Sequence, residues 1–272
     1  MSVLGFLQLL VAVTASLSAM MSVAWLVWSR TRNSGWIDVC WTFGVGFTGV
    51  GGALIAAPAS PTARPLLVMA AAGIWSLRLG IHIARRTSKI GDDPRYAALI
   101  RGWAGDAPWQ MFLLVQKQAL VSVPLAASII VAALNPVLEF RAQDWAAIAV
   151  LFSAIAGEGI ADRQLAKFRQ NAGNRSRVCT TGLWGWSRHP NYFFEWLGWC
   201  AYPLIAIDAG GTFPWGIAAL AAPICMYWLL VHVSGIPPLE AHMLERRPDE
   251  FRAYQARTSS FFPVPPRLMR GA

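Results

Sequence analysis

Residues 3–29 read VLGFLQLLVAVTASLSAMMSVAWLVWS, and none of them is Asp, Glu, Lys or Arg. A helix of about 20 mostly apolar residues is long enough to cross a bilayer. No Lys or Arg precedes the stretch, whereas Arg30 and Arg32 follow it. The stretch is also too long and too uniformly apolar for a cleaved signal peptide. We therefore expect an uncleaved first transmembrane helix whose N-terminus lies outside the cell.

The rest of the chain continues this apolar pattern. Of its 272 residues 56% are hydrophobic and only 14% are charged, against about a quarter charged in soluble domains. Seven segments have the length and composition of spanning helices: 3–29, 36–57, 65–84, 110–134, 145–161, 191–207 and 213–234. We therefore predict an all-α fold, in which residues 1–272 form a single polytopic domain of seven transmembrane helices with a tail at 235–272.

The Lys and Arg residues divide unevenly between the two sides of such a bundle. One side receives the connections 30–35, 85–109, 162–190 and 235–272, which hold 2, 5, 6 and 6 basic residues. The other side receives only Arg64 and Arg141. This distribution is a strong positive-inside signal and predicts a cytosolic C-terminus. Because the long polar connections share that side, we expect the chemistry to face the cytosol.

The net charge of +9 would suggest nucleic-acid binding in a soluble protein. Here the basic residues flank apolar spans, so the expected partners are anionic lipid headgroups or a phosphorylated ligand, and not nucleic acid. The four cysteines show no CxxC spacing: Cys40, Cys179, Cys200 and Cys225. We expect them to be reduced, with no metal bound.

Ionisable side chains inside the predicted spans are costly and often functional. They are Asp38, Arg78, His82, Lys117, Glu158, Glu195 and His232. Snorkelling to the interface, or pairing within the bundle, is the competing explanation for each. Asp38 is the sharpest case, because it lies just inside the second span, near Trp36 and Trp41. Desolvation would favour its protonated form, which could donate a hydrogen bond to a buried carbonyl.

Two predicted cytosolic stretches hold further charged residues. Glu158, Asp162 and Arg169 have the spacing that places them on one face of a helix. A second stretch, at 85–96, is basic at its start and includes acidic residues and a tyrosine. It lies on the same predicted side, where it either completes a pocket or is a solvated loop.

The densest motif is GLWGWSRHPNY at 182–192. Its proline suits the first turn of a helix, so Arg188 and His189 should lie at the mouth of the sixth span, where free N–H groups favour an anion. Asn191 and Glu195 are four residues apart and face the same way. This combination suits a phosphorylated cofactor with amide and ribose hydroxyl groups. A basic loop that binds lipid phosphate is the alternative.

Four motifs resemble those of a known family: WSLRL at 75–79, DPRY at 93–96, GLW at 182–184 and SRHPNY at 187–192. Over about 36–263 the chain resembles the bacterial membrane proteins grouped with the steroid 5-alpha-reductases. The His-Pro-Asn-Tyr motif with a downstream Glu is fairly specific for the wider superfamily. Within it, isoprenylcysteine carboxyl methyltransferases carry a similar Arg-His-Pro-x-Tyr motif. The resemblance implies seven helices, a cytosol-facing NADPH site and a place in the bacterial inner membrane.

The resemblance also implies which residues hold NADPH. Those that match the family's positions in order and spacing are Asp162, Arg169, Arg177, Asn191 and Glu195. The remaining expected cofactor contacts are Arg78, Arg95, Tyr96, Trp186, Arg188 and His189. The chain departs from eukaryotic members at Glu158, where they carry Asn, at Ile236 and Glu240, where they carry His and Tyr, and at Asp38, where they use a Gln-Glu pair.

The reaction implied is the NADPH-dependent reduction of the C=C bond of a 3-oxo-Δ4 steroid or a similar lipophilic enone. Hydride adds to the β-carbon, and the α-carbon is then protonated. A donor aimed at the ketone oxygen lowers the barrier, and protonated Asp38 is the expected catalytic donor. Trp41, Trp75 and His82 are expected to line the cavity with it. We expect a monomer that takes its substrate sideways from the lipid.

Two other functions compete with this one. The first is that of an S-adenosylmethionine-dependent membrane methyltransferase, like the isoprenylcysteine enzymes. Adenosylmethionine carries a positive sulfonium and no phosphates, so it does not need Arg169, Arg177 and Arg188 to converge. The second is lipid binding or transport, which is disfavoured because no paired inverted segments are visible.

Overall fold

The computed structural model describes residues 2–56, 63–103, 105–174 and 177–265. Residue 57 of the second predicted span, residues 175–176 of a basic connection and residues 266–272 of the tail lie outside this description. The described residues are 80% helical and contain no strand. The all-α fold class is therefore confirmed.

Six helical segments in the described ranges are long and apolar enough to cross a membrane. They are α1 (Val3–Thr31), α2 (Gly35–Ala56), α3 (Ala63–Thr87), α5 (Ala107–Ala133), α6 (Ala142–Gln170) and the run Pro214–Arg246. Helix α6 continues to Gln170, well past residue 161, where the apolar span was predicted to end. The prediction stopped there because the last turns of the helix are polar. These segments confirm a multi-pass membrane protein.

The sixth predicted span, 191–207, is interrupted. Helices α7 (Pro190–Trp199) and α8 (Ala201–Ala206) flank a turn at Cys200. Pro203 lacks the N–H that would bond to the carbonyl four residues earlier, which accounts for a break at this point. Neither helix alone is long enough to cross a bilayer. The count of seven spans therefore stays a prediction.

The last predicted span, 213–234, begins where expected but does not end there. The helical run consists of η3 (Pro214–Leu220), α9 (Ala221–Trp228), the π-helical segment η4 (Leu229–Val233) and α10 (Ile236–Arg246). Another helix, α11 (Pro248–Gln255), follows. The tail predicted from residue 235 onward is thus largely helical in its described part, up to residue 265.

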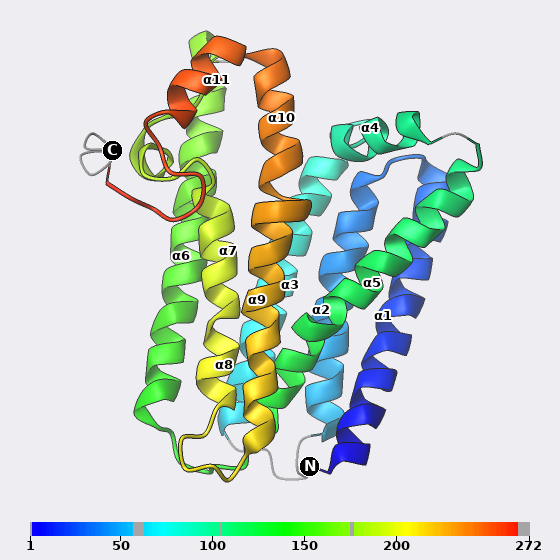
Figure 1. The fold of residues 1–272 in the computed structure, drawn as a ribbon, viewed down its shortest axis with the longest axis vertical. Helices are drawn as coiled ribbons and strands as arrows, with labels where there is room; N and C mark the ends of the chain where they lie inside the picture. The colour runs from blue at the N-terminus through cyan, green and yellow to red at the C-terminus, as the bar shows by residue number, and fades with distance from the viewer. Residues whose placement is uncertain (1, 57–62, 104, 175–176, 266–272) are drawn as a thin grey trace. The chain divides into compact units, whose positions relative to one another are not determined.

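The chain divides into two compact units, which we describe separately. The first unit is Met1–Asp144 with Tyr202–Cys225, and the second is Trp145–Ala201 with Met226–Ala272. In the first unit α2 packs against α1, α3 and α5 (Figure 1). A Cβ atom on Gly46 would lie only 2.3 Å from the hydroxyl oxygen of Ser76. Small residues of this kind let membrane helices approach each other closely.

The first unit contains a buried ionic cluster. Arg64 donates to Asp144 at 2.8 Å, and both side chains are fully buried. Arg141 donates to the same carboxylate and to the carbonyls of Ile205 and Ile207. We call Arg64, Arg141 and Asp144 the Asp144 clamp. Its two arginines are the only basic residues predicted for the sparsely charged side, and the structure pairs both with one carboxylate.

The second unit contains most of α6, together with α7, α10 and α11. A Cβ on Gly157 of α6 would lie 2.3 Å from the ring of Phe194 of α7, so glycine allows these helices to pack closely. A small apolar core joins the loop after α6 to α11, through Val178, Phe251 and Tyr254. This core holds the loop that carries the GLWGWSRHPNY motif.

Candidate functional site

In the first unit, helix α4 (Pro94–Gly102) is positioned by the carboxylate that precedes it. Asp93 accepts a hydrogen bond from the backbone N–H of Arg95 and pairs with the side chains of Arg95 and Arg86. An Asp cap followed by proline is a favourable helix start. Burial alone would raise the pKa of the Asp93 carboxyl, but the hydrogen bonds and charge of Arg95, with the charge of Arg86, hold that pKa below its usual value.

Asp38 of α2 accepts hydrogen bonds from two residues of α4. The Arg95 guanidinium forms an ion pair with one carboxylate oxygen, and the Tyr96 hydroxyl donates to the other at 2.8 Å. A guanidinium partner stabilises an ionised carboxylate, and both oxygens of Asp38 act as acceptors. The geometry therefore places Asp38 as a hydrogen-bond acceptor, and not as the donor expected from the sequence.

The Tyr96 hydroxyl lies in the middle of a chain of hydrogen bonds. The side-chain amide of Gln118, on α5, donates to the phenol oxygen at 2.9 Å, and the phenol donates onward to Asp38. Tyr96 is only 5% exposed. Burial and, after it, the charge of Asp38 raise the pKa of the phenol well above its usual value, so Tyr96 stays protonated. We call Asp38, Arg95, Tyr96 and Gln118 the Asp38 cluster.

The residues expected to line a substrate cavity are only partly brought together. The indole N–H of Trp41 donates to Ser122 at 2.6 Å, and its ring meets the ring of Trp75 edge-on, with centroids 6.3 Å apart. His82 is exposed on α3, and Arg78 is half-buried there. Trp41 and Trp75 thus contact each other, whereas His82 takes no part in this pair, and their role in a cavity stays a prediction.

In the second unit, the end of the described chain lies along the motif at 182–192. The Ser187 hydroxyl donates to the carbonyl of Phe261 at 2.8 Å. The backbone N–H of Arg188 donates to the carbonyl of Ser259, also at 2.8 Å. The hydroxyl of Tyr254 donates to the carbonyl of Trp184. We call residues 258–264 the C-terminal strap. It fixes the backbone that carries Arg188 and His189.

Arg188 and His189 are both held by Glu240 of α10. Glu240 accepts from Arg188 at 2.7 and 3.2 Å, from His189 at 2.9 Å and from Gln255 at 2.7 Å. Burial lowers the pKa of His189, and this outweighs the opposing effect of Glu240. We call Arg188, His189, Glu240 and Gln255 the Glu240 cluster. The two motif residues expected to face an anion are thus already paired within the protein.

The other predicted cofactor residues of the second unit differ widely in burial. The carboxylate Glu158 is buried, and Asp162 is half-buried. The basic residues Arg169 and Arg177 are exposed, as is Trp186. On α7, Asn191 is half-buried, and Glu195 accepts a hydrogen bond from the indole of Trp199 at 3.0 Å.

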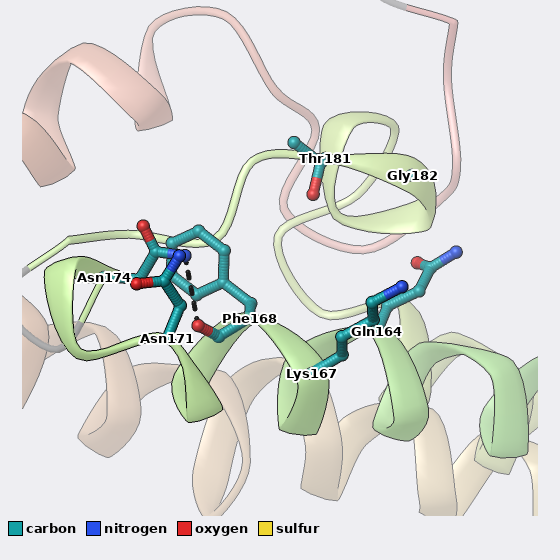
Figure 2. Close-up of a pocket in the computed structure, with 7 residues that line it drawn as sticks. All are labelled: Gln164, Lys167, Phe168, Asn171, Asn174, Thr181 and Gly182. Carbon is teal, nitrogen blue, oxygen red and sulfur yellow. Dashed lines mark hydrogen bonds between the residues drawn. The ribbon is translucent and has the colours of Figure 1, made fainter.

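A pocket of about 430 Å³ lies at the C-terminal end of α6 (Figure 2). The helix and the turn after it contribute Gln164, Lys167, Phe168, Asn171 and Asn174. The sequence suggested a cofactor site near this position, but none of the residues predicted for that site lines the pocket. The pocket is therefore separate from the predicted contacts.

The opposite wall of the pocket comes from Thr181 and Gly182 (Figure 2). Gly182 has a φ of +62°, a left-handed conformation that favours glycine. A Cβ at this position would lie 2.6 Å from the side-chain amide of Gln164. Glycine here therefore keeps the loop close against α6.

Four residues in or beside these clusters were not predicted as site residues: Asp93, Gln118, Glu240 and Gln255. Asp93 has a readable signal, because it precedes the proline that begins α4. Gln118 stands beside the polar Lys117 within an apolar span, which marks the position but not its partner. Glu240 has no local signal, since its partners lie 51 and 52 residues earlier in the chain.

The fold and these clusters define a multi-pass helical membrane protein with two groups of buried and half-buried polar side chains. The chain belongs to the family whose model is described as "Protein of unknown function (DUF1295)", which matches residues 24–258. The matched stretch includes both the Asp38 cluster and the Glu240 cluster. No curated protein and no solved structure matches the chain.

Proposed function

We propose that the protein is an NADPH-dependent reductase of the C=C bond of a lipophilic enone, such as a 3-oxo-Δ4 steroid. It would act as a monomer in the bacterial inner membrane, with its N-terminus outside. Its family is related to steroid 5-alpha-reductase-like membrane proteins, and the motifs around Arg78, Tyr96 and His189 resemble those of such reductases. The observation that carries the proposal is the Asp38 cluster, in which a buried phenol stays protonated beside a carboxylate.

The Asp38 cluster has the chemistry needed to polarise a ketone. Negative charge develops on the ketone oxygen during enone reduction, and a hydrogen-bond donor placed there lowers the barrier. We assign this donor role to the Tyr96 hydroxyl, in place of Asp38. Asp38, paired with Arg95, then orients the phenol and accepts its hydrogen bond in the absence of substrate. The nicotinamide cofactor would supply the hydride.

The residues of the second unit fit NADPH in part. Arg169 and Arg177 are exposed and are the basic side chains that we assign to its phosphates. Asn191 provides an amide suited to the carboxamide of the nicotinamide. Arg188 and His189 do not fit as direct phosphate contacts while Glu240 holds them, so we assign them a positioning role.

The pairing of Arg188 with Glu240 favours a second candidate function. The convergence of Arg169, Arg177 and Arg188 was the reason to prefer a phosphorylated cofactor over S-adenosylmethionine. Because Arg188 pairs with Glu240, it is not available to bind a phosphate directly. A methyltransferase acting on a lipidated or small thiol or carboxyl substrate is therefore the alternative proposal.

Ligand-dependent thermal stability separates the two functions. The purified protein in detergent is heated with NADPH, NADH or adenosylmethionine, each in excess. A ligand at 100 times its Kd stabilises a protein by about 2.7 kcal/mol, so a true cofactor gives a clear shift. Stabilisation by NADPH supports the reductase, and stabilisation by adenosylmethionine alone overturns it. Arg177→Gln should reduce the NADPH shift, whereas Arg30→Gln, at another exposed arginine, should not.

A further inference from the structure

The pocket at the end of α6 presents hydrogen-bond donors to a ligand. The side-chain oxygens of two of its amides already accept hydrogen bonds from backbone N–H groups of the protein. The side-chain oxygen of Gln164 accepts from the backbone N–H of Leu183 at 3.0 Å. The side-chain oxygen of Asn171 accepts from the backbone N–H of Gly173 at 3.0 Å. Each amide therefore has its NH₂ group left for a ligand.

Two more groups strengthen this donor character. Lys167 lines the pocket with its ammonium group, which has donors and no acceptor, and Thr181 adds a hydroxyl from the opposite wall (Figure 2). Asn174 is oriented differently, because its NH₂ group donates to the carbonyl of Phe168 at 3.1 Å. The pocket thus offers one cation and several neutral donors to a ligand that accepts hydrogen bonds.

The charge around the pocket also favours an anion. In the described part of 162–182 the basic residues are Arg163, Lys167, Arg169 and Arg177, all exposed, and the single acidic residue is Asp162. The C-terminus of α6 opposes an anion, with about half a negative charge. The full charges of four basic side chains outweigh that partial charge.

The position of the pocket along α6 indicates the source of the anion. Gln164, Lys167 and Phe168 belong to the last two turns of a helix long and apolar enough to cross a membrane. The ends of such helices lie at the level of the lipid headgroups. Basic pockets at that level bind lipid phosphates, and the Phe168 ring provides an apolar wall beside the charged group.

We propose that this pocket binds a phosphate group through Lys167, Gln164, Asn171 and Thr181, and that an anionic phospholipid headgroup is its source. None of these four residues is assigned to the cofactor or the substrate; the pocket shares with the proposed cofactor site only the surrounding positive charge of Arg169 and Arg177. It gives the chain a lipid-binding site at the surface of the membrane.

The chain has only three lysines, Lys89, Lys117 and Lys167, which makes a direct test possible. Reductive ¹³C-methylation keeps the positive charge and gives each lysine its own NMR signals, and Lys167→Gln identifies those of Lys167. The protein is compared in phosphatidylcholine nanodiscs with and without phosphatidylglycerol. In a separate arm it is titrated with inorganic phosphate in detergent.

A saturable shift of the Lys167 signal with phosphatidylglycerol, larger than the shifts of Lys89 and Lys117, supports a lipid headgroup. The same shift with inorganic phosphate alone supports a phosphate site with a soluble source. Equal shifts of all three lysines, or no shift in either arm, overturn the proposal. Lys167→Gln should also weaken the stabilisation by phosphatidylglycerol about fivefold in apparent affinity, and Lys89→Gln should leave it unchanged.

Discussion

Glu240→Gln tests whether one carboxylate holds the side chains of the GLWGWSRHPNY motif in place. The substitution keeps the size of the side chain, removes its charge and replaces one acceptor oxygen with a donor NH₂ group. Glu240 accepts four hydrogen bonds, and the side chains of Arg188 and Glu240 are only 11% and 12% exposed. Leaving a buried charge without its partner costs about 3–5 kcal/mol, and we expect the lower end because some solvent reaches this pair.

A loss of about 3 kcal/mol corresponds to a fall in Tm of roughly 6–12 °C for a protein of this size. Unfolding in detergent can be followed with a thiol-reactive dye, because Cys179 is only 5% exposed in the same unit. The matched control is Asp249→Asn, which makes the same chemical change at the exposed pair with Arg252 and should leave Tm unchanged. If Glu240→Gln melts as the wild type does, the four bonds do not stabilise the motif and the reasoning is wrong.

Four further changes probe other parts of the molecule. Asp144→Asn leaves Arg64 buried beside an uncharged amide and should cost about 3–5 kcal/mol, measured by the same melting assay; an unchanged Tm would contradict a structural clamp. Gly49→Val places a Cβ 2.6 Å from the Ile129 side chain and should cost about 1–3 kcal/mol by overpacking, again seen as a lower Tm. Burial depresses the pKa of His189. The stability that this group contributes is therefore complete above its unfolded-state pKa and is lost as the pH falls. The melting temperature of His189→Gln should then depend less on acid pH than that of the wild type. Tyr96→Phe should lower NADPH-dependent enone turnover about 100- to 1000-fold while Tyr227→Phe does not, and full turnover by Tyr96→Phe would remove the assigned donor.

The sequence predicts the features of this protein that depend on local pattern. Apolar runs identified the spanning helices, since the cost of exposing backbone in lipid makes length and composition nearly sufficient. The Asp-Pro start of α4 is also a local signal, but α4 lies in the connection predicted for 85–109 and was not itself predicted. The break near Cys200 was missed, although Pro203 marks it, because hydropathy does not register a missing backbone donor.

Partners that are distant in the chain were not predictable in the same way. The sequence shows that Asp38 is costly in a span, but not that Arg95 and Tyr96 both donate to it. It shows Arg188 beside His189, but not the carboxylate of Glu240 that pairs with both. In both cases the hydrogen-bonding role depends on a tertiary contact, so the chemistry inferred from residue types alone was incomplete.

The C-terminal strap has a consequence for how the protein is made. The carbonyl to which Ser187 donates belongs to a residue synthesised 74 positions later. At about 5–20 residues per second, the ribosome needs roughly 4–15 seconds to cover that distance. The motif is therefore synthesised well before residues 258–264, which complete its hydrogen bonds. A nascent chain that stalls before residue 258 would have the helices described above but an unfinished motif, so the motif is completed only after those helices have been synthesised.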